Sequence, residues 1–549
     1  MPRQRIASII SLALPVLSVL ALSAHIVAAL GGASSDSITA PMAVEWKYTG
    51  SAFPNNPSAP LVSGDTVFYA SGGRVYALNS ETGSKKWVYP SGTQLPNPVQ
   101  APLSTDGKTL FVPGGGGLYS LDMNTGLPKF PQYRVGSTGI VTTPVVVGDG
   151  VYFISGNDKL YGLHTDTGTP LSARWGKGLE IGSSSVGDMV AHSGILYFVT
   201  SNMELRAVDA ATGAERWNVH FNGTASSVTP TVSGDNLYVA VGQTLYCLRI
   251  NNGQLIWSIP SRDEYTCPAG GDAEGNAYVV TSSLYVYAIN PLRKPIWKEP
   301  ARVDFPVNAA PLAVGNLLIV GTSFGGVDVF NRTTGHLKWN FAIQATSLNP
   351  NTVPKFNRIL ATPVVSGNQL YVLTDDGSLT AFSPNAVDTI PPTITPLAPL
   401  QGEYVNGRPP FLVEALISDF GSGLRPDSVT LTVDSQQILH VTHDELTNGK
   451  TGFTFNKDTG LLKYTIEEQN TGVSNTLLDG HHFITVTAED WMGNKKNKVW
   501  VFTTGDSFPL EKALQQQNNQ GNQQGGNRNR SGFGGGGGGR KGGGGGGGG

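Results

Sequence analysis

Residues 77–87 read Ala77-Leu-Asn79-Ser-Glu-Thr82-Gly83-Ser-Lys-Lys-Trp87, and residues 207–217 repeat this phrase as Ala207-Val-Asp209-Ala-Ala-Thr212-Gly213-Ala-Glu-Arg-Trp217. Aromatic residues at the place of the final Trp recur along the chain at steps of 40 to 45 residues. These predicted blade-docking residues are Trp46, Trp87, Phe130, Trp175, Trp217, Trp257, Trp297 and Trp339. A period of this length, with short strand-like segments inside each unit, is typical of a β-propeller.

Each unit combines turn residues with short apolar runs. Pairs such as Gly64-Asp65 and Thr82-Gly83 supply turn positions with positive φ at little steric cost. Runs such as Val67-Phe-Tyr69 suit strands that are buried on one or both faces. Asn79 and Asp209 can accept backbone N–H bonds in the turn that follows them. Each Trp offers a large apolar face that can pack between neighbouring sheets.

The last unit is incomplete, and this predicts how the ring closes. Three apolar runs lie between residues 362 and 382, but no Thr-Gly turn or Trp follows them before Pro391-Pro392. At the other end of the chain, Val44-Glu-Trp46-Lys-Tyr48 has the character of an orphan fourth strand. We therefore predict that this strand completes the last blade. The result is an all-β, eight-bladed propeller over residues 43–384 with no open edge.

The repeat resembles the PQQ-like (quinoprotein-type, tryptophan-docking) repeat family, whose phrase is Ala-x-Asp/Asn-x-x-Thr-Gly-x-x-x-Trp. Residues 77–87 and 207–217 match it fully, and residues 329–339 match it with Val329 in place of Ala. The resemblance spans residues 43–384 and implies the propeller fold. It leaves activity open, because the family holds PQQ-dependent alcohol and sugar dehydrogenases, non-enzymatic BamB-like propellers of the outer membrane and extracellular sensor modules.

The N-terminus has the form of a secretory signal peptide over residues 1–29. Arg3 and Arg5 precede an apolar run from Ile6 to Leu22, and small residues follow it. The alternative is an uncleaved anchor helix, since the run is near the length that spans a bilayer. We expect export to the periplasm, the cell surface or the medium, with no integral membrane domain after signal removal.

The pattern changes after residue 384. Residues 385–396 are Pro-rich and are predicted to form a stiff linker between two folding units. Residues 397–504 contain short apolar runs typical of a β-sandwich and resemble bacterial Ig-like domains in phrases such as Ser418–Gly423 and Ala488–Asn494. In these phrases Asp419 and Asp490 can bind Ca²⁺ through carboxylate oxygens. The favoured interpretation is that both aspartates cap turns instead.

Residues 513–549 are rich in Gln and Asn and then almost pure Gly, a composition that cannot bury a core and predicts disorder. Arg528, Arg530, Arg540 and Lys541 lie in this tail beside Phe533. Gly-Arg segments of this kind occur in RNA-binding proteins. In an exported chain, a flexible tether or a surface-adhering tail is the favoured interpretation.

Composition narrows the function without naming it. The chain has 549 residues, a formal net charge of −3 and 14% charged residues, so the folded part shows no sign of a nucleic-acid surface. Export would allow a disulfide between its two cysteines, Cys247 and Cys267, but two buried free thiols are the favoured expectation. The resemblance implies that a dehydrogenase would carry a vicinal Cys-Cys pair, a Ca²⁺ site and an Asp base, and the sequence has no Cys-Cys pair.

These observations favour a secreted, non-enzymatic binding or scaffold protein that engages protein or polysaccharide. No catalytic or cofactor-binding residue is predicted, and no cofactor is expected. One alternative is a PQQ-dependent alcohol or sugar dehydrogenase using PQQ and Ca²⁺. Another is a cell-surface attachment protein that acts through the sandwich and the tail.

Overall fold

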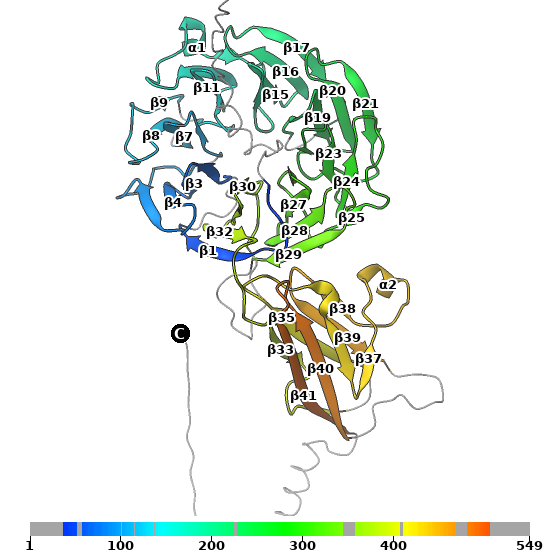
Figure 1. Cartoon of the computed structure of the whole chain (residues 1–549). Helices are drawn as coiled ribbons and strands as arrows, with labels where there is room; N and C mark the ends of the chain where they lie inside the picture. Colours follow the sequence, from blue (N-terminus) through cyan, green and yellow to red (C-terminus); the bar gives the residue numbers. More distant parts are fainter. Residues whose placement is uncertain are drawn as a thin grey trace, which may run out of the picture.

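The computed structural model describes residues 37–51, 58–99, 101–114, 116–136, 138–223, 228–343, 357–406, 410–467 and 480–505. The predicted signal peptide and the Gly-rich tail lie outside these residues. The described chain is almost entirely β-structure, with two five-residue helices, α1 (Ala173–Lys177) and α2 (His443–Thr447), and one 3₁₀ turn, Pro426–Ser428. It folds as a ring with a smaller unit at its rim (Figure 1).

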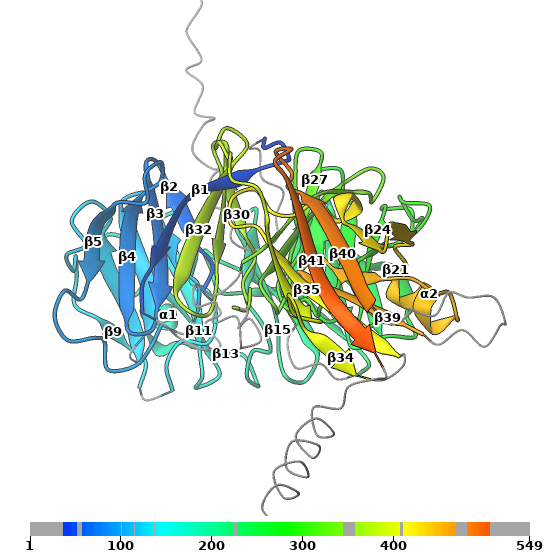
Figure 2. The ribbon, with the colours of Figure 1, turned by 90° about the horizontal axis from the view of Figure 1, so that it is seen from below.

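The ring is made of antiparallel four-stranded sheets, and the described residues hold eight of them (Figures 1 and 2). The first four sheets in chain order contain β2 (Leu61–Ser63), β3 (Thr66–Ser71), β4 (Arg74–Asn79) and β5 (Lys85–Tyr89); β6 (Ser104–Thr105), β7 (Thr109–Gly114), β8 (Gly117–Asp122) and β9 (Tyr133–Arg134); β10 (Val145–Val147), β11 (Gly150–Ser155), β12 (Lys159–His164) and β13 (Leu179–Glu180); and β14 (Val190–His192), β15 (Ile195–Val199), β16 (Glu204–Asp209) and β17 (Glu215–His220). The next three contain β18 (Thr231–Ser233), β19 (Asn236–Val241), β20 (Thr244–Arg249) and β21 (Leu255–Pro260); β22 (Gly270–Gly271), β23 (Ala277–Val280), β24 (Tyr285–Ile289) and β25 (Ala301–Arg302); and β26 (Leu312–Val314), β27 (Leu317–Gly321), β28 (Gly326–Asn331) and β29 (Leu337–Ala342). The last sheet combines β30 (Val364–Ser366), β31 (Gln369–Leu373) and β32 (Ser378–Ser383) with the N-terminal strand β1 (Ala43–Thr49).

Every ring sheet is covered on both faces by its neighbours, and the sequence reflects this. Strands β3 and β11 are buried at all six positions, as expected of runs that are apolar without alternation. The core therefore consists of separate seams between adjacent sheets. In one such seam Phe68 and Ala77 of one sheet pack with Leu110 and Val112 of the next.

The N-terminal strand closes the ring as predicted. Strand β1 pairs antiparallel with β32, with Val44 opposite Phe382 and Tyr48 opposite Leu379. Trp46 packs in a cluster that joins this sheet to the sheet of β2–β5. Because the first and last ring segments share one sheet, neither presents a free strand edge at this point.

The docking aromatic side chains lie against the turns of the next sheet. The Thr-Gly glycine is needed there for two reasons: Gly126 has a φ of +69°, and a Cβ on it would lie 2.6 Å from the Trp87 ring. The polar residue before each turn caps it, as Asn79 does by accepting the N–H groups of Glu81 and Thr82. The glycine therefore allows the turn and, because it has no side chain, lets the indole pack directly on the backbone.

Three docking residues do not lie in a fourth strand, contrary to the expectation from the repeat. Phe130 and Trp297 lie in loops, and Trp175 lies in α1. In each of these units a proline stands where the other units begin the fourth strand, and it makes only an isolated bridge: Pro128, Pro170 and Pro295. Proline has no N–H to donate to the ladder, so the fourth strand starts later and is only two residues long.

The smaller unit is a β-sandwich, as predicted. One sheet contains β33 (Thr393–Ala398), β35 (Phe411–Ser418), β39 (Leu461–Ile466) and β38 (Thr454–Asn456), and the other contains β34 (Tyr404–Asn406), β41 (Lys495–Gly505), β40 (Gly480–Glu489), β36 (Thr430–Val433) and β37 (Gln436–Ile438). Val413 and Leu462 of the first sheet share a core with Ile484 and Trp500 of the second. Burial alternates along β40, as expected of a strand with one solvated face.

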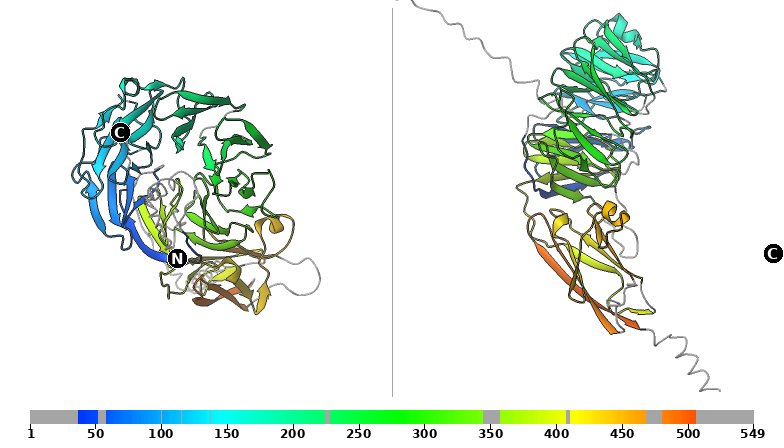
Figure 3. Two further views of the ribbon diagram at one scale, coloured as in Figure 1. Left: turned by 45° about the horizontal axis from the view of Figure 1, so that its top comes forward. Right: turned by 90° about the vertical axis from the view of Figure 1, so that its right-hand side faces the viewer.

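The sandwich lies at the rim of the ring beside β29 (Figure 1; Figure 3, right). The segment predicted as a stiff linker between two units, residues 385–396, differs from that expectation in two ways. Its last residues already belong to β33, which begins at Thr393, and Asp388 bonds to the sandwich loop through Ser422. Within the described residues, no helix is long and apolar enough to cross a bilayer.

Candidate metal centre

The joint between ring and sandwich is built on the last docking tryptophan. Trp339 in β29 is fully buried, and its Nε1 donates to the backbone oxygen of Ser422 at 2.8 Å. In the ring, Trp297 makes the same kind of bond to the oxygen of Arg332 in the next sheet, also at 2.8 Å. The sheet that follows β29 lacks a Thr-Gly turn, so a loop of the sandwich occupies the docking position.

The loop that receives Trp339 is shaped by Asp419. This residue follows β35, and its Oδ1 accepts the N–H groups of Gly421, Ser422 and Gly423 at 3.0, 2.9 and 2.7 Å. Gly423 has a φ of +83°, and a Cβ there would lie 2.5 Å from the backbone oxygen of Asn340 in β29. Only glycine at this position lets the loop lie directly on the rim strand.

Two further aspartates cap neighbouring segments. Asp490 follows β40, and its Oδ1 accepts the N–H groups of Met492 and Asn494 at 2.9 and 2.8 Å. Asp388 lies in the connecting segment, and its Oδ2 accepts both the N–H and the hydroxyl of Ser422 at 2.8 Å. All three aspartates are thus held rigidly by turn geometry.

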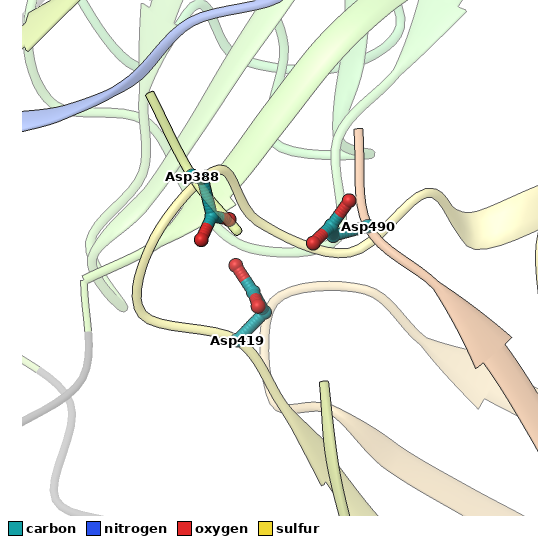
Figure 4. A group of neighbouring side chains, drawn as sticks. All are labelled: Asp388, Asp419 and Asp490. Carbon is teal, nitrogen blue, oxygen red and sulfur yellow. The ribbon is translucent and has the colours of Figure 1, made fainter. Parts of the chain in front are cut away.

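The three carboxylates converge at the joint (Figure 4). One oxygen from each of Asp388, Asp419 and Asp490 lies within 4.8 Å of the other two. Asp490 is fully buried and Asp419 is 8% exposed. Among the described residues, none of the three forms an ion pair with Lys or Arg. Three acidic groups therefore share a site that no lysine or arginine of the described chain neutralises.

The electrostatics of the site favour a bound cation. Burial, together with the nearby carboxylates of Asp388 and Asp490, raises the pKa of Asp419 to about 6. Its Oδ2 has no hydrogen-bond partner among the described residues. Rigid carboxylate oxygens at this separation are the ligands that Ca²⁺ prefers, and a divalent cation would offset the mutual repulsion. The residues that would hold it are Asp388, Asp419 and Asp490.

The two interpretations of Asp419 and Asp490 from the sequence are compatible. Both residues cap turns, which was the favoured interpretation. The capping bonds of Asp419 use only Oδ1, whereas Asp490 also accepts the Asn494 amide on Oδ2 at 2.7 Å. A carboxylate has about four lone-pair sites, so capping leaves room for a metal. Sequence reasoning missed Asp388, because it lies in the apparent linker, 31 residues before Asp419, with no motif to connect them.

A second buried cluster fastens the sandwich to β28. Lys457 of the sandwich places Nζ 2.8 Å from Asp328, 3.1 Å from Asp458 and 3.5 Å from Asp304. Asp328 and Asp458 are fully buried, and each keeps one carboxylate oxygen without a hydrogen-bond partner in the described chain. A Cβ on Gly326 would lie 2.6 Å from the Asp458 carboxylate.

In this cluster one lysine faces three aspartates, so the carboxylates outnumber the cation. Burial raises the pKa of Asp458 to about 8 and raises that of Asp328. Burial alone would lower the pKa of Lys457, but the adjacent carboxylates of Asp328 and Asp458 raise it, so the lysine stays charged. Lys457 thus stabilises two buried acids on opposite sides of the joint.

A further acid that the sequence did not single out, Asp188, is partly buried between two adjacent sheets of the ring. Asp188 lies before β14, and its Oδ1 accepts the N–H and hydroxyl of Thr143, before β10, at 2.7 and 2.9 Å. Burial raises its pKa. These bonds tie the starts of adjacent sheets. Cys247 and Cys267 are buried free thiols, as expected.

The ring of sheets with seated indoles defines a tryptophan-docking β-propeller. Residues 39–219 and 175–386 match the family model described as "Outer membrane protein assembly factor BamB". Together these matches cover more than half of the chain, which belongs to this family.

Curated relatives match over part of their length. The chain is 28% identical over 212 residues to the outer membrane protein assembly factor BamB of Moranella endobia (strain PCIT), covering 36% of this chain and 53% of the relative. The BamB of Yersinia pestis is 26% identical over 222 residues, covering 36% and 56%. The serine/threonine-protein kinase AfsK of Streptomyces griseus is 28% identical over 185 residues, covering 28% and 23%. The chain spans about half the length of the BamB relatives.

Two solved structures resemble part of the chain at low identity. BamB from Moraxella catarrhalis has a TM-score of 0.46 and 17% identity, covering 62% of this chain and 100% of that one. Quinohemoprotein alcohol dehydrogenase from Comamonas testosteroni has a TM-score of 0.48 and 13% identity, covering 66% and 79%.

Proposed function

We propose that this protein is a non-enzymatic scaffold of the cell envelope that binds a protein partner through its propeller, with the sandwich docked on the ring as part of the same rigid body. Membership in the BamB family supports a scaffold, and the family relatives are named as outer membrane assembly factors. The predicted signal peptide supports a place outside the cytoplasm. Binding to polysaccharide is the second possibility for the ligand.

The observation that carries this proposal is the bond from Trp339 to Ser422. It places the sandwich in a docking position that belongs to the repeat, and the clusters of Asp388 and Lys457 secure it on either side. A rigid scaffold loses little conformational entropy when it binds a partner. In this role, Ca²⁺ at Asp388, Asp419 and Asp490 would hold the joint in its docked form.

Sequence features argue against the dehydrogenase alternative. The two cysteines are 20 residues apart, so the chain cannot form the vicinal disulfide that the enzymatic relatives carry. Asp188, a partly buried acid of the ring, accepts bonds from Thr143 that join adjacent sheets. A general base must have its carboxylate in reach of the substrate proton, which this structural engagement disfavours.

The test has two arms. In the first, a photo-cross-linking residue replaces exposed Glu264 or Glu299 at the ring, or exposed Lys496 on the sandwich as a matched control. We expect ring positions to give a discrete cross-linked protein in envelope preparations and the control to give none. In the second arm, the chain is incubated with PQQ, Ca²⁺, an alcohol or aldose and a redox dye. Turnover above a heat-treated control would overturn the scaffold and promote the dehydrogenase.

A further inference from the structure

A polar groove opens where the ring closes. It has a volume of about 500 Å³ and lies between the last sheet, completed by β1, and the first sheet, β2–β5. Its lining includes turn residues from both sheets together with Glu45 of β1. The groove therefore exists only because the N-terminal strand completes the ring. Its size is in the range of small-ligand and side-chain pockets.

The floor of the groove is rigid. Trp46 Nε1 donates to the backbone oxygen of Ser80 at 2.9 Å. The Tyr371 hydroxyl lies within hydrogen-bond distance of the same oxygen, at 3.2 Å, and of Gln369 Oε1, at 2.5 Å. The two rings pack with their centroids 6.0 Å apart. Ser80 itself lines the groove and is 8% exposed, yet its hydroxyl has no hydrogen-bond partner among the described residues. The hydroxyl of this mostly buried residue is therefore available to a ligand in the groove.

The walls carry unpaired acids and amides. Glu45 and Glu81 line the groove, and neither carboxylate has an ion pair or a hydrogen bond in the described chain. The side-chain amides of Asn368 and Asn385 also face it without partners there. The lining contains no lysine, arginine or histidine. The groove is thus a set of acceptors with two negative charges and no internal cation.

We propose that this groove binds an arginine-bearing polypeptide segment. A guanidinium has five N–H donors in a planar fork, which suits two carboxylates flanked by amide oxygens. A sugar is less well matched, because the one aromatic residue in the lining, Tyr371, is 1% exposed and offers no face on which a sugar ring could stack. The proposal rests on the protein-binding role proposed above and names the chemistry of the partner.

Such a segment occurs in this chain as well as in potential partners. Residues 513–549 contain four basic residues, Arg528, Arg530, Arg540 and Lys541, and no acidic residue. A partner protein can supply the same chemistry. The experiment must therefore separate the chain's own tail from a segment added in trans.

The probe is a fluorescein-labelled peptide of residues 526–541, and the parent protein is the full chain with R528Q/R530Q/R540Q/K541Q. We expect the peptide to bind this parent, and E45Q/E81Q in the same background to weaken binding about tenfold or more. The matched control D166N/D235N, on exposed turns of two other sheets outside the groove lining, should change affinity less than about twofold. A peptide with Gln at its four basic positions should not bind.

Comparison with the unmodified tail then identifies the source. Weaker peptide binding by the wild-type chain than by the parent shows that its own tail occupies the groove, and equal binding shows that the groove is open to a partner. Asn385→Ala, which removes one amide and no charge, should weaken binding less than E45Q/E81Q and guards against misfolding of the double variant. Absence of peptide binding by the parent, or equal binding by E45Q/E81Q, would overturn the proposal. Failure of the groove proposal would leave cross-linking to a protein partner unaffected. The groove and the scaffold function can therefore be disproved independently.

Discussion

The indole Nε1 of Trp339 donates to the backbone oxygen of Ser422, 83 residues further along the chain. In the ring, the corresponding bonds from Trp46 and Trp297 reach only 34 and 35 residues, to the turn of the next sheet. The sandwich has therefore taken over a docking position that belongs to the propeller repeat. The last unit of the ring lacks a Thr-Gly turn, and the sandwich at the rim supplies the loop that takes its place.

Replacing Trp339 with Ala should destabilise the whole chain. The side chain is fully buried, so the expected loss in free energy of unfolding is about 3–5 kcal/mol. Urea denaturation followed by circular dichroism measures it. Trp217→Ala, at a half-buried docking position within the ring, is the control and should cost less. Equal losses in the free energy of unfolding for the two variants would mean that the sandwich adds nothing to the packing of Trp339.

Ring closure makes a separate prediction. Trp46→Ala should cost about 3–5 kcal/mol, because the indole is 9% exposed and packs across the closing seam. Deleting residues 37–48 should expose the edge of β32 and cause aggregation. Size-exclusion chromatography and thermal melting test both variants. A truncated chain with unchanged melting temperature and monomer yield would show that β1 is dispensable.

Calcium should stabilise the joint. A ligand at 100 times its Kd adds about 2.7 kcal/mol to the free energy of unfolding. Millimolar Ca²⁺ should therefore raise the melting temperature, and a chelator should reverse the rise. Asp490→Asn should abolish the response. Asp235→Asn, at an exposed turn of the ring, should leave it intact. An unchanged melting temperature on chelation of the native protein would leave the three aspartates as turn caps only.

Stability should fall as the pH rises from about 4 to 8. Burial raises the folded pKa of Asp458 to about 8, above its ordinary value near 4, so the folded state holds a proton that the unfolded state releases in this window. The stabilising contribution is complete below the unfolded pKa and is lost as the pH approaches the folded pKa.

Asp458→Asn should reduce this slope, most clearly above pH 6, where Asp419 contributes less because its folded pKa is about 6. Urea midpoints measured at intervals between pH 4 and 8 give the slope. Asp427→Asn, at an exposed position of the sandwich, is the control and should keep the native slope. If Asp458→Asn shows the same dependence of the urea midpoint on pH as the unmodified protein, the Asp458 carboxylate is ionised in the folded protein.

Periodicity predicts the ring well because the same packing problem recurs in every unit. Seating an indole on a Thr-Gly turn requires both residue types at fixed spacing, so the pattern survives in the sequence and also predicts closure by Trp46. The departures also have a local cause: Pro128, Pro170 and Pro295 interrupt the fourth strand. These prolines were visible in the sequence and could have been used.

The joint could be predicted only in part. Asp419 and Asp490 follow strands in recognisable phrases. Asp388 stands in no such phrase, and only the folded structure brings it close to them. Lys457 and Asp328 are 129 residues apart, and neither stands in a motif. A docking surface between two units depends on which faces meet, and periodicity within each unit carries no information about that.

Scanning calorimetry tests most directly whether the propeller and the sandwich form one cooperative body. With Ca²⁺ present, the unmodified chain should unfold in a single transition whose calorimetric and van't Hoff enthalpies agree. Trp339→Ala should separate this peak into two, one for each unit. Two well-resolved transitions in the unmodified chain, at positions that Trp339→Ala does not change, would contradict the docked scaffold.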